Sequence, residues 1–345
     1  NQSFAMKLKT VTLFLLTFVA GYIQGQKAIE VIAFGSCLKE TRPQPIWEAV
    51  LEANPDVFVM LGDNIYGDTR DMVKLRQKWR TLDEVPGFRR LRSECRLLAI
   101  WDDHDYGEND AGASYPKKVE SQEAFLDFLN EPEDSPRRKT PGIYDAQIIG
   151  PPEKRVQFIL LDTRYFRTAL LRNPSRKRGQ GPYMPNPDPK ARILGPEQWK
   201  WLKEQLLKPA EIRIIASSIQ VLSIHHGWET WGNFPKERDR LLKLIKTTKA
   251  NGVVFLSGDR HSAEISKLDV GVPYPILDAT ASAMNQRQKP VEEYNPYRVS
   301  KHYFNENFGL MKIKWSGNIP KISLQIMDLE GKLVDSRKVV FPESQ

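Results

Sequence analysis

Six short apolar runs, each followed by residues able to do chemistry, constrain the fold of this 345-residue chain more than any other feature. The runs are continuous and not alternating, which is typical of strands buried on both faces. We predict strands at Ile29–Phe34, Val57–Leu61, Leu97–Trp101, Val156–Leu161, Ile212–Ala216 and Val253–Leu256. The polar residues at their ends are Ser36 and Cys37, Asp63 and Asn64, Asp103 and His104, Asp162 and Arg164, Ser217 and Gln220, and Asp259 and His261.

Helical patterns lie between several of these runs. We predict helices at Pro45–Asn54, Ser121–Asn130, Pro196–Leu207 and Lys236–Thr248, where apolar residues recur at helical spacing or a proline opens the segment. Strands that alternate with helices indicate a largely parallel sheet covered by helices. Ligands of such sheets bind beyond the carboxyl ends of the strands, so we expect the polar residues there to converge.

The pattern changes after Asp259 to closely spaced strands. We predict Ala263–Leu268, Tyr274–Ala279, Phe308–Trp315, Lys321–Met327 and Lys332–Phe341, joined in part by hairpins, as the second half of a β-sandwich within the same domain. Composition predicts loops at Glu131–Pro141 and Arg172–Leu194. The second is long enough to be a flap over a site, and a surface insertion is an equal alternative.

The start of the chain has the architecture of a secretory signal. Met6, Lys7 and Lys9 form a basic start, and the apolar run Thr10–Ala20 follows, which is shorter than the roughly 20 residues of a membrane-spanning helix. We therefore predict that residues 1–25 are a signal peptide with the leading extension Asn1–Ala5. Residues 26–345 would form one domain, secreted or periplasmic, without a transmembrane segment.

Composition is that of a globular protein, with 40% hydrophobic and 27% charged residues and a net charge of +8. Without residues 1–25, which include Lys7 and Lys9 and no acids, the charge falls from +8 to +6. A basic exterior favours anionic substrates, and a simple solubility balance explains it equally well. No stripe of basic and aromatic residues indicates nucleic-acid binding, and the oligomeric state is open.

The densest chemical signal follows the apolar run at residues 97–101. Five acids fall within nine residues there: Asp102, Asp103, Asp105, Glu108 and Asp110. Such carboxylates repel one another unless they are solvated, protonated or neutralised by cations, and we predict metal ions. Asp103 would be a ligand and His104 a proton donor to a leaving group. A solvated acidic turn is the alternative.

Other strand ends supply further metal ligands. Asp63, after a strand and a glycine, can bridge two cations, and Asp259 and His261 repeat this arrangement. Tyr66 could be a phenolate ligand or a buried structural tyrosine. Cys37 could be a thiolate ligand or form one disulfide with Cys95.

Basic and aromatic residues near the predicted site could bind substrate. Arg164 and Arg167 follow a strand, and their guanidinium groups could clamp a phosphate or pair with Asp162 or another acid. His225 and His226 lie beside Trp228, and the sequence leaves open which histidine lines the site. We take Arg167, His226 and Trp228 as candidate substrate-binding residues.

The chain resembles the PhoD-like alkaline phosphatases, a branch of the metallophosphoesterases. The resemblance rests on FGSC at Phe34–Cys37, GDNIYGD at Gly62–Asp68, WDDHDYGEN at Trp101–Asn109, LDTRYFR at Leu161–Arg167 and SGDRH at Ser257–His261, and it spans about Ile29 to Ala283. It implies an α/β fold, a four-layer αββα sandwich with mixed sheets and C-terminal antiparallel strands at about 308–341. It also implies Fe³⁺ and Ca²⁺, with Cys37, Asp63, Tyr66 and Asp259 as the iron set and Asp63, Asp103, Asn109 and His261 on the calcium side.

We therefore expect a secreted enzyme that hydrolyses phosphate mono- or diesters by attack of a metal-bound hydroxide. His104 would protonate the leaving group, and Arg164 would grip a phosphoryl oxygen. Three rivals are a Ser36-x-x-Lys39 acyl enzyme, which lacks its companion motifs, a Cys37–His nucleophile, which leaves the acids unexplained, and a secreted protein in which calcium stabilises loops without turnover.

Overall fold

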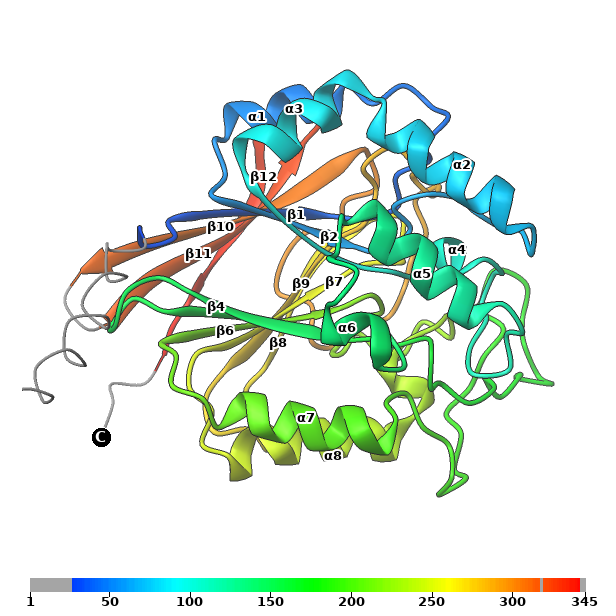
Figure 1. Cartoon of the computed structure of the whole chain (residues 1–345). Helices are drawn as coiled ribbons and strands as arrows, with labels where there is room; N and C mark the ends of the chain where they lie inside the picture. Colours follow the sequence, from blue (N-terminus) through cyan, green and yellow to red (C-terminus); the bar gives the residue numbers. More distant parts are fainter. Residues whose placement is uncertain (1–26, 317–318, 342–345) are drawn as a thin grey trace, which may run out of the picture.

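Two six-stranded mixed sheets pack face to face, and helices cover the outer face of each sheet (Figure 1). The computed structural model describes residues 27–316 and 319–341. The predicted four-layer αββα arrangement is confirmed. No helix among these residues is long and apolar enough to cross a membrane, and the predicted signal peptide lies outside them.

The first sheet has the order β12-β11-β10-β1-β2-β3. Its strands are β1 (Val31–Gly35), β2 (Val57–Leu61), β3 (Arg96–Ile100), β10 (Asn307–Ser316), β11 (Ile319–Asp328) and β12 (Leu333–Val339). Strands β1, β2 and β3 are parallel, whereas β10 pairs antiparallel with β1. Its outer helices are α1 (Ile46–Glu52), α2 (Met72–Asp83), α3 (Pro86–Glu94) and α5 (Lys118–Phe128).

The second sheet has the order β4-β5-β6-β7-β9-β8. Its strands are β4 (Asp145–Ile149), β5 (Val156–Leu160), β6 (Ile212–Ser217), β7 (Val253–Ser257), β8 (Ala263–Leu268) and β9 (Ile276–Ala281). Helices α7 (Pro196–Leu206) and α8 (Pro235–Thr247) cover it. Three short helical segments complete the structure: α4 (Asp103–Tyr106), α6 (Pro136–Lys139) and η1 (Trp231–Asn233).

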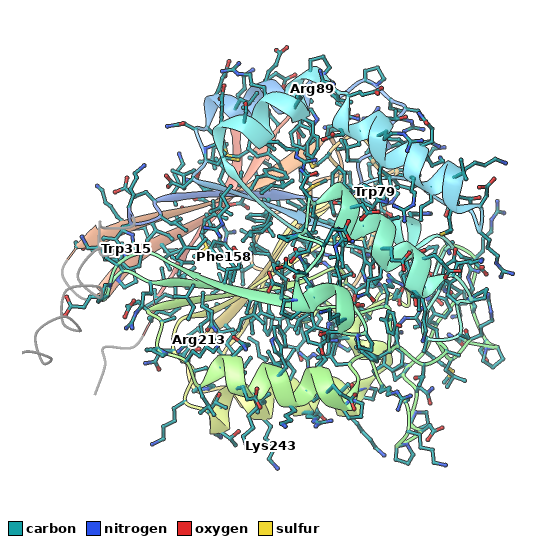
Figure 2. The ribbon with its side chains drawn as sticks, viewed as in Figure 1. Trp79, Arg89, Phe158, Arg213, Lys243 and Trp315 are labelled. Carbon is teal, nitrogen blue, oxygen red and sulfur yellow. The ribbon has the colours of Figure 1, made fainter. Side chains whose placement is uncertain are left out.

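The central strands of the second sheet are buried on both faces, as their continuous apolar runs predict. On β5, Phe158 belongs to the core cluster that lies between the sheets, and Ile159 belongs to the cluster under α7 and α8. Figure 2 shows Phe158 in the interior and Lys243 on the outer side of α8. Successive side chains point to opposite faces of a strand, so each central strand contributes to both clusters.

The structure corrects two predictions of element placement. The strands after Asp259 do not form one half of the sandwich: β8 and β9 join the second sheet, and β10, β11 and β12 complete the first. The predicted loop Glu131–Pro141 contains the short helix α6, which the Ser135 side chain caps by accepting a hydrogen bond from the Arg137 N–H. The cysteines do not form the disulfide that the sequence left open, since both are free thiols.

The loop at residues 172–194, called the strap below, contains no helix or strand, as predicted. It is nonetheless packed against the segment 226–228. The backbone N–H of Gly181 donates to His226 O at 3.3 Å, and that of Tyr183 donates to Gly227 O at 2.8 Å. An added Cβ at Gly181 would lie 2.0 Å from the carbonyl carbon of Gly227, so this close approach requires glycine.

Candidate active site

The ends of β1, β2, β3 and β7 meet between the two sheets, and glycines allow them to approach. A Cβ on Gly62 would lie 2.5 Å from Cβ of Asp102, so the turns after β2 and β3 touch. A Cβ on Gly258 would lie 2.7 Å from Oγ of Ser36, which brings the turn after β7 against the end of β1. Both sheets therefore contribute donors to one site.

Four of the predicted ligands have left-handed backbone conformations, with φ of 58° at Cys37, 51° at Asp63, 69° at Asp259 and 52° at His261. Residues with a Cβ pay energy to adopt this conformation, and such residues cluster at functional sites. Here the sharp turns direct their side chains into the space between the sheets.

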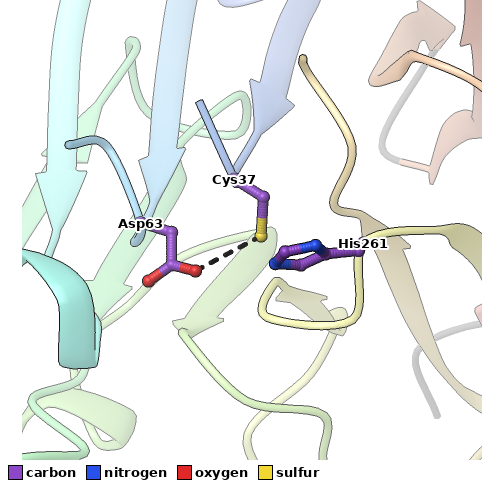
Figure 3. A group of neighbouring side chains, drawn as sticks. All are labelled: Cys37, Asp63 and His261. Atoms are coloured by element: carbon purple, nitrogen blue, oxygen red, sulfur yellow. Dashed lines mark hydrogen bonds between the residues drawn. The ribbon is translucent and has the colours of Figure 1, made fainter. Parts of the chain in front are cut away.

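Cys37, Asp63 and His261 face one another in Figure 3, with donor atoms within 4.8 Å. The thiol of Cys37 donates to Oδ2 of Asp63 at 3.5 Å and lies 3.2 Å from Oγ of Ser282. The hydroxyl of Tyr66 donates to Oδ2 of Asp63 at 3.4 Å and lies 3.2 Å from Nε2 of His261. A thiol, an imidazole, a phenol and a carboxylate therefore lie close together in one part of the site.

A second set of donors lies on the other side of Asp63. The ligand atoms of Asp63, Asp103 and His104 form one group within 4.8 Å, and those of Asp102, Asp103 and Asp259 form another. This grouping differs from the partition that the resemblance implies, because His261 lies with Cys37 and Asp259 lies with Asp103. Asp63 belongs both to the group with Cys37 and His261 and to the group with Asp103 and His104.

Burial and neighbouring charges shift the pKa values of these groups. Burial raises the pKa of Asp63 well above its usual range, and Cys37 and Asp103 raise it further. Burial also raises the pKa of Cys37 to about 12 and that of Asp259 to about 7. Burial and Arg260 lower the pKa of His261 to about 4, which keeps its imidazole neutral. Cations between these donors would favour the deprotonated acids and thiolate.

One orphaned atom supports this interpretation. Oδ1 of Asp63 is buried and has no hydrogen-bond partner among the described residues, although a buried carboxylate oxygen is normally paired. The donors around it fit metal ions of two kinds. The thiol and imidazole of Cys37 and His261 are donors that transition metals prefer, and the carboxylates of Asp103 and Asp259 are donors that hard cations prefer.

His104 is held by an acidic residue beside the second set of donors. Its Nδ1 lies 2.7 Å from Oδ1 of Asp68, and its ring lies against that of Tyr66 at 4.2 Å between centroids. Burial alone would lower the pKa of His104, but the hydrogen bond with Asp68 and the charge of Asp103 raise it to about 9. The imidazole is therefore protonated at neutral pH.

Arg164 and Arg167 lie in the alternative arrangement that the sequence allowed, paired with acids. Arg164 is fully buried, and its guanidinium lies 2.5 Å from Oδ1 of Asp102 and 2.6 Å from Oε2 of Glu229. Nε of Arg167 lies 2.8 Å from Oε1 of the same Glu229. Since Arg164 follows β5 and Asp102 follows β3, the pair joins the ends of the two sheets.

Asn109, whose role as a ligand stays a prediction, is exposed. The carboxylate of Asp110, the next residue, lies within 4.8 Å of ligand atoms of Asp103 and Glu229. The Asp110 N–H donates to Oδ2 of Asp103 at 2.7 Å.

The two other acids of this segment have distinct contacts. Asp105 accepts hydrogen bonds from the N–H of Ile65 at 2.9 Å and from Nδ2 of Asn64 at 3.0 Å, so it fixes the turn that carries Asp63. Glu108 is exposed and pairs with Arg70.

His226 is buried and His225 is exposed. Burial alone does not say which of them lines the site, so the choice of His226 stays a prediction. Nδ1 of His226 accepts from the Trp228 N–H at 3.0 Å, and its Nε2 has no partner among the described residues. Trp228 is 36% exposed, and the guanidinium of Arg260 lies 5.8 Å from its ring centroid. Arg260 lies between Asp259 and His261 in the sequence, so Trp228 lies next to these two predicted metal ligands.

Three further residues at the site were not predicted from the sequence. Glu229 pairs with both arginines, and Tyr183 of the strap donates a hydrogen bond to Oδ2 of Asp110. Glu40 accepts from the Tyr66 N–H at 2.9 Å and so holds that loop. All three lie outside the helices and strands, where no periodicity distinguishes a site residue from a surface one.

Comparisons with known proteins agree with this geometry. A family model described as PhoD-like phosphatase matches residues 32–302. Alkaline phosphatase D of Bacillus subtilis (strain 168) is 29% identical over 191 residues, which cover 50% of this chain and 32% of that protein. The match thus spans about a third of the length of this curated relative.

Solved structures show the same fold. A structure of PhoD superposes with a TM-score of 0.68 at 17% identity, covering 93% of this chain and 73% of that chain. The purple acid phosphatase PPD1 from yellow lupin seeds has a TM-score of 0.58 at 10% identity, covering 91% and 54% of the two chains. The chain therefore has the metallophosphoesterase-type fold.

Proposed function

The chain belongs to the PhoD-like phosphatase family, and on this premise we propose that it hydrolyses phosphate mono- or diesters with metal ions, outside the cytoplasm. The observation that carries the proposal is Asp63, whose carboxylate lies between two sets of donors and has an unpartnered buried oxygen. Residues 26–345 would form the single catalytic domain.

The donors would divide between two cations. Cys37, Tyr66 and His261 would hold a transition metal, for which we propose Fe³⁺, and Asp103 and Asp259 would hold Ca²⁺, with Asp63 shared. The predicted ligand Asn109 is exposed beside Asp110, and we keep it as a candidate for the calcium side. When bound, the cations would lower the pKa of water and offset charge on the phosphoryl group.

The chain's own residues would supply the proton and the orientation. His104, held by Asp68 and protonated at neutral pH, would donate its proton to the leaving oxygen. Arg164 would position Asp102 and Glu229 beside the ligands, because contact with a substrate would require it to break a buried ion pair.

Substrate would enter past the exposed ring of Trp228. This ring and the buried His226 form a wall that adjoins Asp259 and His261 through Arg260, which supports their predicted role in binding. Arg167, whose side chain is buried, would contribute to substrate binding indirectly, through its ion pair with Glu229.

Reporter hydrolysis tests the proposal against the rival of a calcium-stabilised protein without turnover. Purified protein is incubated with an aryl phosphomonoester and an aryl phosphodiester, with and without chelator. We expect hydrolysis that chelation abolishes and added metal restores, and the ratio of the two rates gives the preference between monoester and diester. Bound metal without hydrolysis of either reporter would support the rival.

A further inference from the structure

A cavity of about 340 Å³ lies directly beside the acid cluster, between the segment 108–116 and the strap. Its lining includes Asp110, Tyr115, Arg167, Arg172 and Tyr183. Asp110 belongs to both regions, because its carboxylate lies within 4.8 Å of ligand atoms of Asp103 and Glu229. A group bound in the cavity would therefore adjoin a phosphoryl group held by the cluster.

Most charges in this cavity are already paired. Arg167 pairs with Glu229, Arg70 at the rim pairs with Glu108, and Tyr183 donates its hydroxyl hydrogen to Asp110. Arg172 differs: no carboxylate lies within ion-pair distance of it in the described part of the chain. Its guanidinium is exposed and lies 5.8 Å from the ring centroid of Tyr183.

The backbone holds Arg172 in this position. Arg172 and Tyr183 form an antiparallel bridge within the strap, and the strap is fixed to the segment 226–228 by the close contact of Gly181 with Gly227. Tyr183 is then anchored to Asp110. Among the described residues, Arg172 is thus the unpaired cation of the cavity, and these contacts fix the backbone that carries it.

We propose that this cavity is a subsite for the leaving group, and that Arg172 selects phosphate esters whose leaving group is small and itself anionic. The inference rests on the proposed function. The volume is at the lower end of the range for small-molecule sites, which suits a group of a few heavy atoms. A carboxylate or a second phosphate would form a charge-assisted contact with the guanidinium.

Three substrates with the same carbon frame test the subsite: glycerol phosphate, phosphoglycerate and glycerol bisphosphate. We expect wild type to prefer the two anionic leaving groups, measured as kcat/KM relative to glycerol phosphate. Arg172→Gln should lower that preference about tenfold, mainly through KM, because one charged hydrogen bond is lost. The two anionic substrates distinguish a carboxylate site from a phosphate site.

Two control variants separate recognition from loop structure. Arg172→Lys keeps the charge and should retain most of the preference, and Arg178→Gln, at an exposed arginine of the same loop, should leave it unchanged. An equal loss on all three substrates in Arg172→Gln, or no preference in wild type, would overturn the subsite while leaving the phosphoesterase proposal intact. If no ester is hydrolysed, the proposed function fails, and calorimetric titration with phosphoglycerate still tests the subsite: equal affinity in wild type and Arg172→Gln would overturn it.

Discussion

At the residue scale, the buried ion pair of Arg164 with Asp102 and Glu229 combines two tasks. It neutralises acids beside the candidate ligands, and it joins turns that leave different sheets. Burial raises the pKa of Asp102 well above its usual range, and the positive charge of Arg164 opposes this rise, so the guanidinium favours the ionised carboxylate.

Replacing Arg164 should therefore cost stability. Arg164→Met leaves Asp102 and Glu229 buried without their cation, and removal of one partner from a buried pair costs about 3–5 kcal/mol. Urea denaturation measures the free energy of unfolding. Arg164→Lys, which keeps a charge, should lose less. An unfolding free energy within about 1 kcal/mol of wild type in Arg164→Met would show that the pair is not structural.

The His104–Asp68 contact predicts a pH dependence of activity. A proton donor works while it is protonated, so the rate should fall on the alkaline side, as pH rises through a pKa of about 9. Asp68→Asn removes the carboxylate that raises this pKa, and the alkaline limb of kcat should shift to lower pH. A pH–rate profile measures the shift. An unchanged alkaline limb in Asp68→Asn would exclude His104 as the donor.

Residues next to a strand end could be predicted from sequence, and residues deeper in loops could not. Cys37, Asp63 and Asp103 closely follow three neighbouring parallel strands of the first sheet, which brings them together, and Asp259 follows β7 of the facing sheet. Asn109 lies three residues beyond the end of α4, and its side chain is exposed. The partners of Arg164 were equally hidden, because sequence gives no register between turns from different sheets.

At the element scale, the strap is held to the body of the molecule at the contact between Gly181 and Gly227. Gly181→Ala would force these backbones apart and release the segment that carries Arg176, Lys177 and Arg178. We expect trypsin to cut there several-fold faster than in wild type. Ser175→Ala, at an exposed position of the same loop, is the control. Equal cleavage rates in the two variants would contradict the role given to this contact.

Helices and strands were predictable to the extent that their pattern was distinct. The apolar runs gave the central strands within one or two residues, but none of the predicted elements covered α2, although Leu75, Trp79 and Leu82 recur there at helical spacing. Strand β4 was missed because its side chains are mostly half-buried at a sheet edge. The later strands were identified, but their division between sheets depends on pairing that local pattern does not encode.

At the scale of the whole molecule, the site joins two sheets. Cys37, Asp63 and Asp103 come from the first sheet, and Asp259 and His261 come from the second. Without cations, burial raises the pKa of both Asp63 and Asp259, and the negative charge of Asp103 raises each of them further. Bound metal should therefore stabilise the sandwich as well as serve catalysis.

Chelation should lower the melting temperature. A ligand present at about a hundred times its Kd stabilises a folded protein by about 2.7 kcal/mol, so removal of the ions should lower Tm by several degrees. Differential scanning calorimetry of chelated protein, before and after metal is restored, measures this change. A Tm that does not respond to chelation would show that the sheets are held together without ions.

The metal content of Asp63→Asn tests the central claim most directly. Elemental analysis of wild type, Asp63→Asn and the exposed control Asp134→Asn is combined with hydrolysis of the phosphate reporters by the same preparations. We predict that Asp63→Asn remains folded, because Asn has nearly the shape of Asp and removes a buried charge. This variant should lose bound metal and activity together, whereas Asp134→Asn should keep both. Wild-type metal content and rate in Asp63→Asn would contradict a shared, bridging carboxylate at the centre of this site.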